Sequence, residues 1–208
     1  MKRLFYLMLE LFGYVLSKIF DYNFLMKFKL IKRLIYSSWY KRFFKSYGKN
    51  FHLDYPFYGL GLEFVEIGDD FIGCPGLRIE AWSQYRDDHF KPEIIIGNNV
   101  CFNYNCHIGG IGKITIGDNV LIGSNVLITD HYHGKTDLES LKIPPISRSL
   151  YYKGEVIIEN NVWIGENVSI MPNVIIGENC VIGANSVVTK SFPRNSLVAG
   201  VPAEIINK

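Results

Sequence analysis

The segment ITDHYHGK, residues 128–135, carries two histidines, His131 and His133, in a form suited to chemistry. Histidine is the side chain that changes charge closest to neutral pH, so an imidazole can take up a proton and release it during a reaction. A neutral imidazole is also a common ligand of metal ions. The pair therefore predicts either acid–base catalysis or a metal site, depending on the elements that position it.

These histidines interrupt a six-residue repeat. In residues 156–188 an aliphatic side chain returns at every sixth position, and similar stretches occupy residues 94–103 and 114–128; the positions in the longest stretch are Ile158, Ile164, Ile170, Ile176, Ile182 and Val188. Neither the helix period nor simple strand alternation explains this spacing. Asn and Asp follow the aliphatic residues and tolerate the left-handed backbone of tight turns. The pattern predicts short strands stacked into a parallel β-helix with the aliphatic residues inside.

The repeat stops after Ile128 and resumes near Val156. Long excursions from a compact domain usually serve a function. We therefore expect a protruding loop over about residues 129–155. Two further segments, 81–90 and 147–154, also interrupt the repeat and combine aromatic rings with Arg, which suits either stacking on sugar rings or ordinary loop packing.

Residues 1–57 differ in composition from the rest of the 208-residue chain. They carry 11 Lys or Arg against Glu10, Asp21 and Asp54, a net charge of +8, whereas residues 58–208 have a net charge of −6. Apolar residues between Leu4 and Val15 follow the spacing of a helix, and we expect residues 1–47 to be helical. The sequence thus predicts two regions, a basic, aromatic, helical one over 1–57 and a β-helix domain over 58–208.

The sequence leaves two interpretations of residues 1–47. Their apolar stretch is too short to span a bilayer, and no small-residue cleavage site follows it. The segment is suited to contact with an anionic membrane surface, or to packing against the β-helix or a sister subunit. A nucleic-acid partner is not expected, because no recognisable nucleic-acid module accompanies the basic residues.

The stretches ITIGDNVLIGSNV, NVWIGENV, IGANSVVTK and AGVPAEII resemble the hexapeptide-repeat acyltransferases, in particular sugar O-acetyltransferases of the galactoside, maltose and capsule or lipopolysaccharide type. The resemblance covers about residues 60–206. It implies a mainly β protein, a left-handed parallel β-helix with a helical N-terminal region and a protruding loop. It also implies a homotrimer with active sites between subunits, acetyl-CoA as acyl donor, a saccharide as acceptor and a place in polysaccharide biosynthesis.

The resemblance places His131 on the family's catalytic histidine. As general base it takes the proton of a sugar hydroxyl while the oxygen attacks the thioester carbonyl, and transfer is then direct within a ternary complex. Asn103 falls on a position that contacts the acceptor sugar, with a corner residue of the coil as the alternative. His133 has two interpretations, a group that positions the acceptor or an exposed bystander.

The resemblance also implies a donor site toward the C-terminus. Ala184 and Lys190 fall on family positions that contact the donor, where a Lys ammonium suits a pyrophosphate; a solvated edge charge is the alternative for Lys190. Glu166 departs from the pattern, because galactoside-type relatives have a small hydroxyl residue there. A carboxylate is unfavourable beside phosphates, which puts the donor contacts of this coil in doubt.

Two other functions remain open for the same fold. A zinc enzyme of the γ-type carbonic anhydrase kind would use His107, His131 and His133 as ligands, but that family spaces its later pair of histidines more widely. A non-catalytic scaffold or sugar-binding module is the other alternative. We expect the acetyltransferase, without a metal, in the cytoplasm or at the inner face of the membrane.

Overall fold

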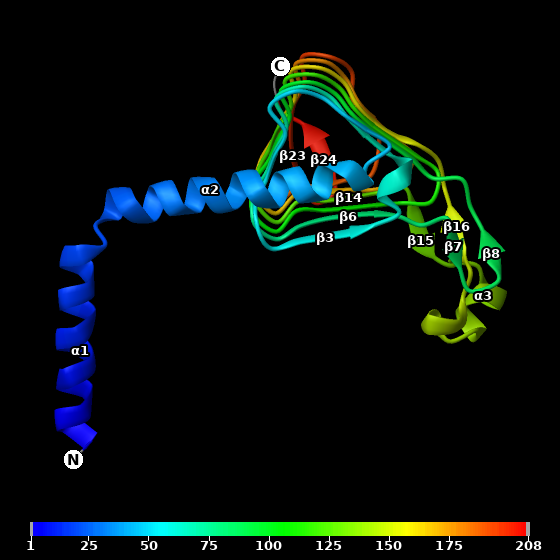
Figure 1. Ribbon diagram of the computed structural model, residues 1–208. Coiled ribbons are helices and arrows are strands. Elements are labelled where there is room, and N and C mark those ends of the chain that lie inside the picture. Colours follow the sequence, from blue (N-terminus) through cyan, green and yellow to red (C-terminus); the bar gives the residue numbers. More distant parts are fainter. Residues whose placement is uncertain (1, 207–208) are drawn as a thin grey trace.

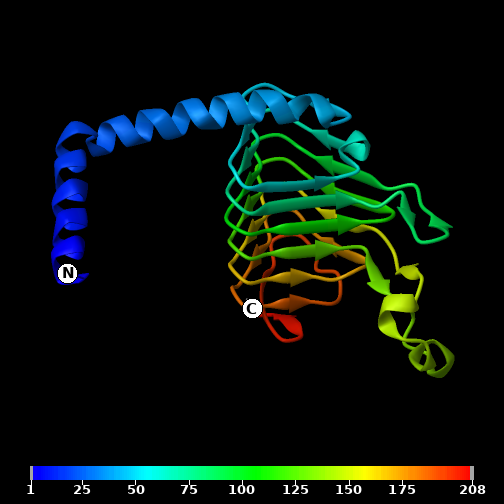
Figure 2. The same cartoon turned by 60° about the horizontal axis from the view of Figure 1, so that its bottom comes forward.

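The computed structural model describes residues 2–206 as two long helices followed by short, stacked, mainly parallel strands (Figure 1). Three sheets form the faces of a triangular prism, and successive turns of the chain add a strand to each face (Figures 1 and 2). This is the parallel β-helix that the six-residue repeat predicts.

The three sheets are named here in the order in which the chain meets them. The first sheet contains β1 (Ser46–Tyr47), β4 (Val65–Ile67), β9 (Glu93–Ile96), β12 (Lys113–Ile116), β17 (Val156–Ile158) and β20 (Val174–Ile176). The second contains β2 (His52–Leu53), β5 (Ile72–Gly73), β10 (Cys101–Phe102), β13 (Leu121–Ile122), β18 (Trp163–Ile164), β21 (Val181–Ile182), β23 (Leu197–Gly200) and β24 (Ala203–Ile205). The third contains β3 (Phe57–Leu60), β6 (Leu77–Ala81), β11 (His107–Gly110), β14 (Leu127–Thr129), β19 (Ser169–Ile170) and β22 (Val187–Val188). All pairs in them are parallel except β23 with β24.

The first turn of the β-helix begins earlier than the composition suggests. β1 starts at Ser46 and pairs with β4, so strands already form inside the segment 1–57. Helical structure occupies α1 (Lys2–Ile19), α2 (Tyr22–Tyr40) and a 3₁₀ turn (Lys41–Phe43). The expectation of helix up to residue 47 is therefore wrong for β1, because Ser46 and Tyr47 gain ladder hydrogen bonds from the second turn.

The repeated aliphatic residues fill the interior. Strand register places Ile116 beside Ile158 and Ile158 beside Ile176, and all three are at most 1% exposed. Matching ladders run through the other two sheets. Full burial of one such side chain stabilises the fold by about 1.5–3 kcal/mol, so the stacked hexads supply most of the core.

Asparagines occupy the corners between sheets with a left-handed backbone. Asn125, Asn167 and Asn185 have φ values of 59°, 56° and 61°. Their side-chain amides form a ladder, Asn125 donating to Asn167 at 3.0 Å and Asn167 donating to Asn185 at 3.1 Å. Asn is among the few non-glycine residues that adopt this conformation readily, which explains the recurrence of Asn after each hexad.

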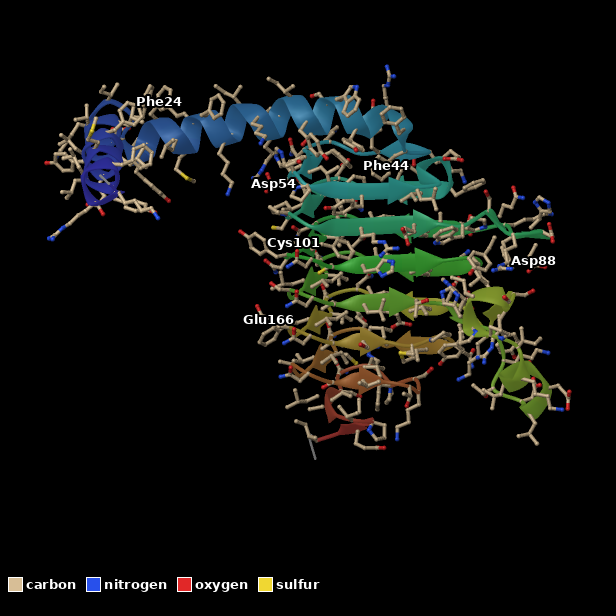
Figure 3. All side chains as sticks on the ribbon, turned by 90° about the horizontal axis from the view of Figure 1, so that it is seen from below. Phe24, Phe44, Asp54, Asp88, Cys101 and Glu166 are labelled. Atoms are coloured by element: carbon tan, nitrogen blue, oxygen red, sulfur yellow. The ribbon has the colours of Figure 1, made fainter. Side chains whose placement is uncertain are left out.

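The second half of α2 closes one end of the prism. Arg33 donates to both carboxylate oxygens of Asp54, at 2.7 and 2.6 Å, beneath the helix (Figure 3). The backbone N–H of Leu53, in β2 at the edge of the second sheet, donates to the buried Ser37 hydroxyl at 2.8 Å. Phe44, which is buried, continues this cover onto the core. At the opposite end β24 folds back on β23.

Two excursions leave the prism at the corner between the third and first sheets (Figure 1). The shorter is a hairpin of β7 (Gln84–Tyr85) and β8 (Asp88–His89), and the longer contains β15 (His131–His133), α3 (Leu138–Lys142), a 3₁₀ turn (Pro145–Ser147) and β16 (Leu150–Tyr152). β15 pairs antiparallel with β16. Arg86 of the hairpin donates to the Ile146 carbonyl, so the two excursions support one another.

Candidate active site

His131 opens β15, directly after the chain leaves the third sheet. Its Nδ1 lies 2.9 Å from Oδ1 of Asp130, a carboxylate with 0% exposure. Asp130 also accepts the backbone N–H groups of Ile111, at 3.0 Å, and Gly112, at 2.8 Å. With the Asp130 carboxylate as the acceptor, Nδ1 of His131 is the donor and Nε2 is left to accept a proton. This tautomer is the one that a general base requires.

A cleft of about 380 Å³ lies beside His131. The third sheet supplies one wall, with Thr129 and Met171, and the two excursions supply the other, with Trp82, Tyr85 and Leu150. The Tyr85 ring lies 5.7 Å from the ring of His133, measured between centroids. Aromatic faces beside polar groups are suited to a sugar ring, whose apolar and hydroxyl surfaces both need partners.

A second polar cluster lines the same cleft. Oε2 of Glu80 accepts from Nη2 of Arg78 at 2.7 Å and lies 3.2 Å from Nε2 of His107. Burial alone would raise the pKa of Glu80, but the hydrogen bond and charge of Arg78 hold it below the ordinary value. Burial, followed by the Arg78 charge, lowers the pKa of His107. The cluster therefore places an ionised carboxylate beside a neutral imidazole.

Gly109 lies between His107 and His131. A Cβ at this position would come within 3.3 Å of Nε2 of His107 and 3.6 Å of Cε1 of His131. The absence of a side chain keeps open the floor of the cleft between the two imidazoles. The strand itself fixes this arrangement, because Gly109 pairs with Glu80 and with Thr129 in the neighbouring turns.

The predicted site residues separate into two groups within one chain. His131 and His133 line the cleft, with ring centroids 6.4 Å apart. Asn103 lies at a corner after β10, where its amide donates to the Ile122 carbonyl at 2.9 Å. Ala184 lies at a corner stacked on Gly165, and Nζ of Lys190 is 2.6 Å from Glu204. None of these three lines the cleft.

Arg78 and Glu80, which line the cleft, and Asp130, which is buried behind His131, are not singled out as site residues by the sequence motifs. Asp130 directly precedes His131 in the sequence, but the sequence motif does not show that its carboxylate is buried against the imidazole. Arg78 and Glu80 meet His107 only through the register of β6 with β11. Over residues 2–206 no three His, Cys, Asp or Glu side chains are grouped as a metal site would require.

The comparisons with known proteins point to one family. Residues 155–190 match the family described as bacterial transferase hexapeptide (six repeats). WbbJ of Escherichia coli (strain K12), named for O-acetyl transfer in lipopolysaccharide biosynthesis, is 40% identical over 148 residues, which cover 69% of this chain and 71% of WbbJ. The galactoside O-acetyltransferase of the same organism is 42% identical over 124 residues, covering 57% and 56% of the two chains.

Solved structures share the architecture. The hexapeptide-repeat acetyltransferase VCA0836 of Vibrio cholerae O1 biovar eltor, solved with acetyl coenzyme A, has a TM-score of 0.52 at 26% identity and covers 80% of this chain and 72% of that one. The N-acyltransferase AntD of Bacillus cereus has a TM-score of 0.62 at 24% identity, with 81% and 86% covered, a likeness of fold alone.

The parallel β-helix of hexads, together with the similarity to WbbJ, defines a hexapeptide-repeat transferase. The chain belongs to this family, and within it to the sugar O-acetyltransferase type. It is therefore an acyltransferase.

Proposed function

We propose that the chain transfers an acetyl group from acetyl-CoA to a hydroxyl of a sugar or polysaccharide precursor. The observation that carries this proposal is the His131–Asp130 pair, which presents Nε2 of the imidazole beside a cleft of about 380 Å³. The relationship to WbbJ supports a saccharide acceptor. The acetyl coenzyme A in the VCA0836 structure supports the donor.

In the proposed mechanism Nε2 of His131 takes the proton of the acceptor hydroxyl as its oxygen bonds to the acetyl carbonyl carbon. The carbon–sulfur bond then breaks, and the imidazolium returns the proton to the departing thiolate. Asp130, whose Oδ1 lies 2.9 Å from Nδ1 of His131, stabilises the imidazolium. Transfer is direct in a ternary complex, and His133, with its ring against Tyr85, would position the acceptor.

The proposal includes a left-handed coil and a homotrimer in which a neighbour completes each site. Asn103 is remote from His131 within one chain, and in the trimer it would reach the acceptor bound at the neighbour's histidine. An apolar stripe on the outer face of the second sheet offers a surface for assembly. Ile72, Leu121 and Trp163 in this stripe are 36%, 45% and 54% exposed.

The donor would lie along the later turns, against Ala184 and Lys190. Lys190 forms an exposed ion pair with Glu204, and exposed pairs of this kind contribute at most about 1 kcal/mol. The pyrophosphate could therefore displace Glu204 at little cost. Glu166, at an outer corner of the coil in Figure 3, stays the least favourable neighbour for a phosphate.

We further propose that catalysis belongs to site residues within the segment 58–208, and that the helical part of residues 1–57 serves location, while β1 and β2 complete the first turn of the β-helix. The enzyme would act in the cytoplasm, where residues 1–47 meet the inner face of the membrane. Across residues 2–206 the helices lack the combined length and apolar character of a bilayer span. Contact at the surface is therefore the form of membrane association proposed.

Thermal unfolding with and without acetyl-CoA tests the function, on the wild type beside His131→Ala. Ligand at about a hundred times its dissociation constant stabilises a fold by roughly 2.7 kcal/mol, and both proteins should gain this. Only the wild type should acetylate saccharide acceptors, with a loss of at least about 100-fold in the variant.

Absence of any shift at millimolar acetyl-CoA would overturn the proposal. Metal analysis would then follow, since bound zinc would favour the carbonic-anhydrase kind of site with His107, His131 and His133. A shift in both proteins with equal transfer rates would remove His131 from the mechanism and leave the donor site standing.

A further inference from the structure

Helix α1 has two chemically distinct sides. With 3.6 residues per turn, Leu4, Met8, Leu11, Phe12, Val15 and Ile19 lie on one side. Lys2, Tyr6, Glu10 and Ser17 lie on the other. A helix with one wide apolar side normally buries that side against another element.

Among residues 2–206 nothing covers the apolar side of α1. The helix has no buried residue, and Leu4, Met8, Leu11 and Ile19 are 65%, 63%, 64% and 65% exposed. Figures 1 and 2 show α1 standing clear of the prism, joined to it only through α2. So large a contiguous apolar surface marks a contact site with something outside the chain.

Helix α2 extends this surface. Its Arg33, Tyr36 and Ser37 face the end of the prism, where Tyr36 accepts the Phe57 backbone N–H at 3.3 Å. Phe28 and Ile35 project elsewhere and are 60% and 67% exposed. Together with Trp39 they line an apolar groove on α2. One side of this helix is therefore bound to the prism, and another side is uncovered.

The charge of the two helices selects the partner. Between Lys2 and Lys45 the basic side chains outnumber the acidic ones, which are only Glu10 and Asp21. Asp21 is engaged locally, because it accepts the Phe24 N–H at 2.7 Å as the N-cap of α2. Leucine and aromatic residues on one side, with Lys and Arg around them, suit the boundary between acyl chains and anionic head groups.

We propose that α1 and the uncovered side of α2 dock on an anionic phospholipid bilayer, with α1 lying in the plane of the surface and its apolar side facing the acyl chains. The inference deepens the membrane contact named under the proposed function by assigning it to this surface. It does not depend on acetyl transfer. A second copy of this chain is the competing occupant, but the same basic helices on two copies would repel one another, whereas an anionic bilayer attracts them.

Co-sedimentation of the full chain with vesicles tests the proposal. One set of vesicles is phosphatidylcholine alone, and the other contains phosphatidylglycerol. Met8→Asp combined with Phe12→Asp places two carboxylates on the apolar side of α1. Tyr6→Asp combined with Ser17→Asp, the matched control, makes the same change of charge on the other side.

The wild type should bind the anionic vesicles at least about tenfold more strongly than the neutral ones. The apolar-side variant should lose tenfold or more in partitioning, and the control variant less than threefold. Since α1 has no buried residue, both variants should keep the wild-type unfolding temperature, which excludes misfolding as the cause.

Three results would overturn the proposal: no binding to anionic vesicles, an equal loss in both variants, or a change in oligomeric mass of the apolar-side variant without lipid. The last would identify a second copy as the occupant. Acetyl transfer is measured separately, on a soluble saccharide without vesicles. Loss of membrane binding and loss of acetyl transfer can therefore be told apart.

Discussion

Glu80 and His107 meet in the cleft although 27 residues separate them in the chain. The carboxylate favours the protonated imidazole, while burial and the charge of Arg78 favour the neutral one and prevail, so the pKa of His107 is lowered. The pKa of His107 thus depends on burial and on a few neighbouring charges. A single substitution that removes one of these charges should shift this pKa measurably.

Glu80→Gln should lower the pKa of His107 further. The substitution removes the group that raises this pKa and leaves burial and Arg78 unopposed, so His107 stays neutral to a lower pH. Titration of the imidazole by NMR measures the shift. Glu93→Gln, at an exposed carboxylate paired with Lys113, is the control and should leave His107 unchanged. An unchanged or higher pKa in Glu80→Gln would contradict the assigned balance.

The sequence predicts the position of His131 better than it predicts the contact between His107 and Glu80. His131 follows from a local motif, since it comes directly after a hexad and begins the interruption. The partnership of His107 with Glu80 depends on which turn stacks on which. The irregular segment 81–93 between them hides that register, so no local pattern reveals the contact.

The stacked turns repeat one corner design, in which the amide of one Asn bonds to the Asn of the next turn. The hexads predict this part of the fold well, because burial and left-handed turns are both local requirements. The start of the β-helix at Ser46 is not predicted, because the six-residue positions of β1–β3 hold Tyr47, Leu53 and Gly59, of which only Leu53 is aliphatic.

Asn167 allows the corner design to be measured. Asn167→Gly removes the amide contacts but keeps the left-handed backbone accessible, whereas Asn167→Ala removes both. We expect the alanine variant to be less stable than the glycine variant by about 1 kcal/mol, the cost of a side chain in this conformation. Unfolding in denaturant measures the difference. Equal stabilities would show that the amide ladder, and not the backbone conformation, sets the choice of Asn.

At the scale of the whole molecule, the cleft contains only part of the proposed site. His131 and His133 are present, whereas Asn103, Ala184 and Lys190 lie elsewhere on the chain. Activity should therefore require neighbouring copies, and the apolar stripe of the second sheet is the surface on which assembly is proposed to depend.

Leu121→Glu should dissociate the assembly. It places a carboxylate in the stripe, where burial between subunits would desolvate the charge. Sedimentation velocity should show a smaller species, and acetyl transfer should fall at least about tenfold while His131 is unchanged. Ile175→Glu, at a residue of similar exposure on the first sheet, is the control. An intact trimer in the Leu121 variant, or dissociation of the control alone, would contradict the proposed interface.

The corner ladder connects Asn119 to Asn161 across 42 residues of chain and Asn167 to Asn185 across only 18, with similar bonds in both cases. The rod thus keeps its register whatever length of chain leaves it between two turns. In the proposed function, acceptor choice would depend on the length and sequence of the expelled segment, which also carries His131. The stacked turns would hold Asp130, through its bonds to Ile111 and Gly112, and present the surfaces proposed for the donor and for assembly. Under that proposal, new saccharide specificities would arise through changes in the expelled segment, without redesign of the stacked turns.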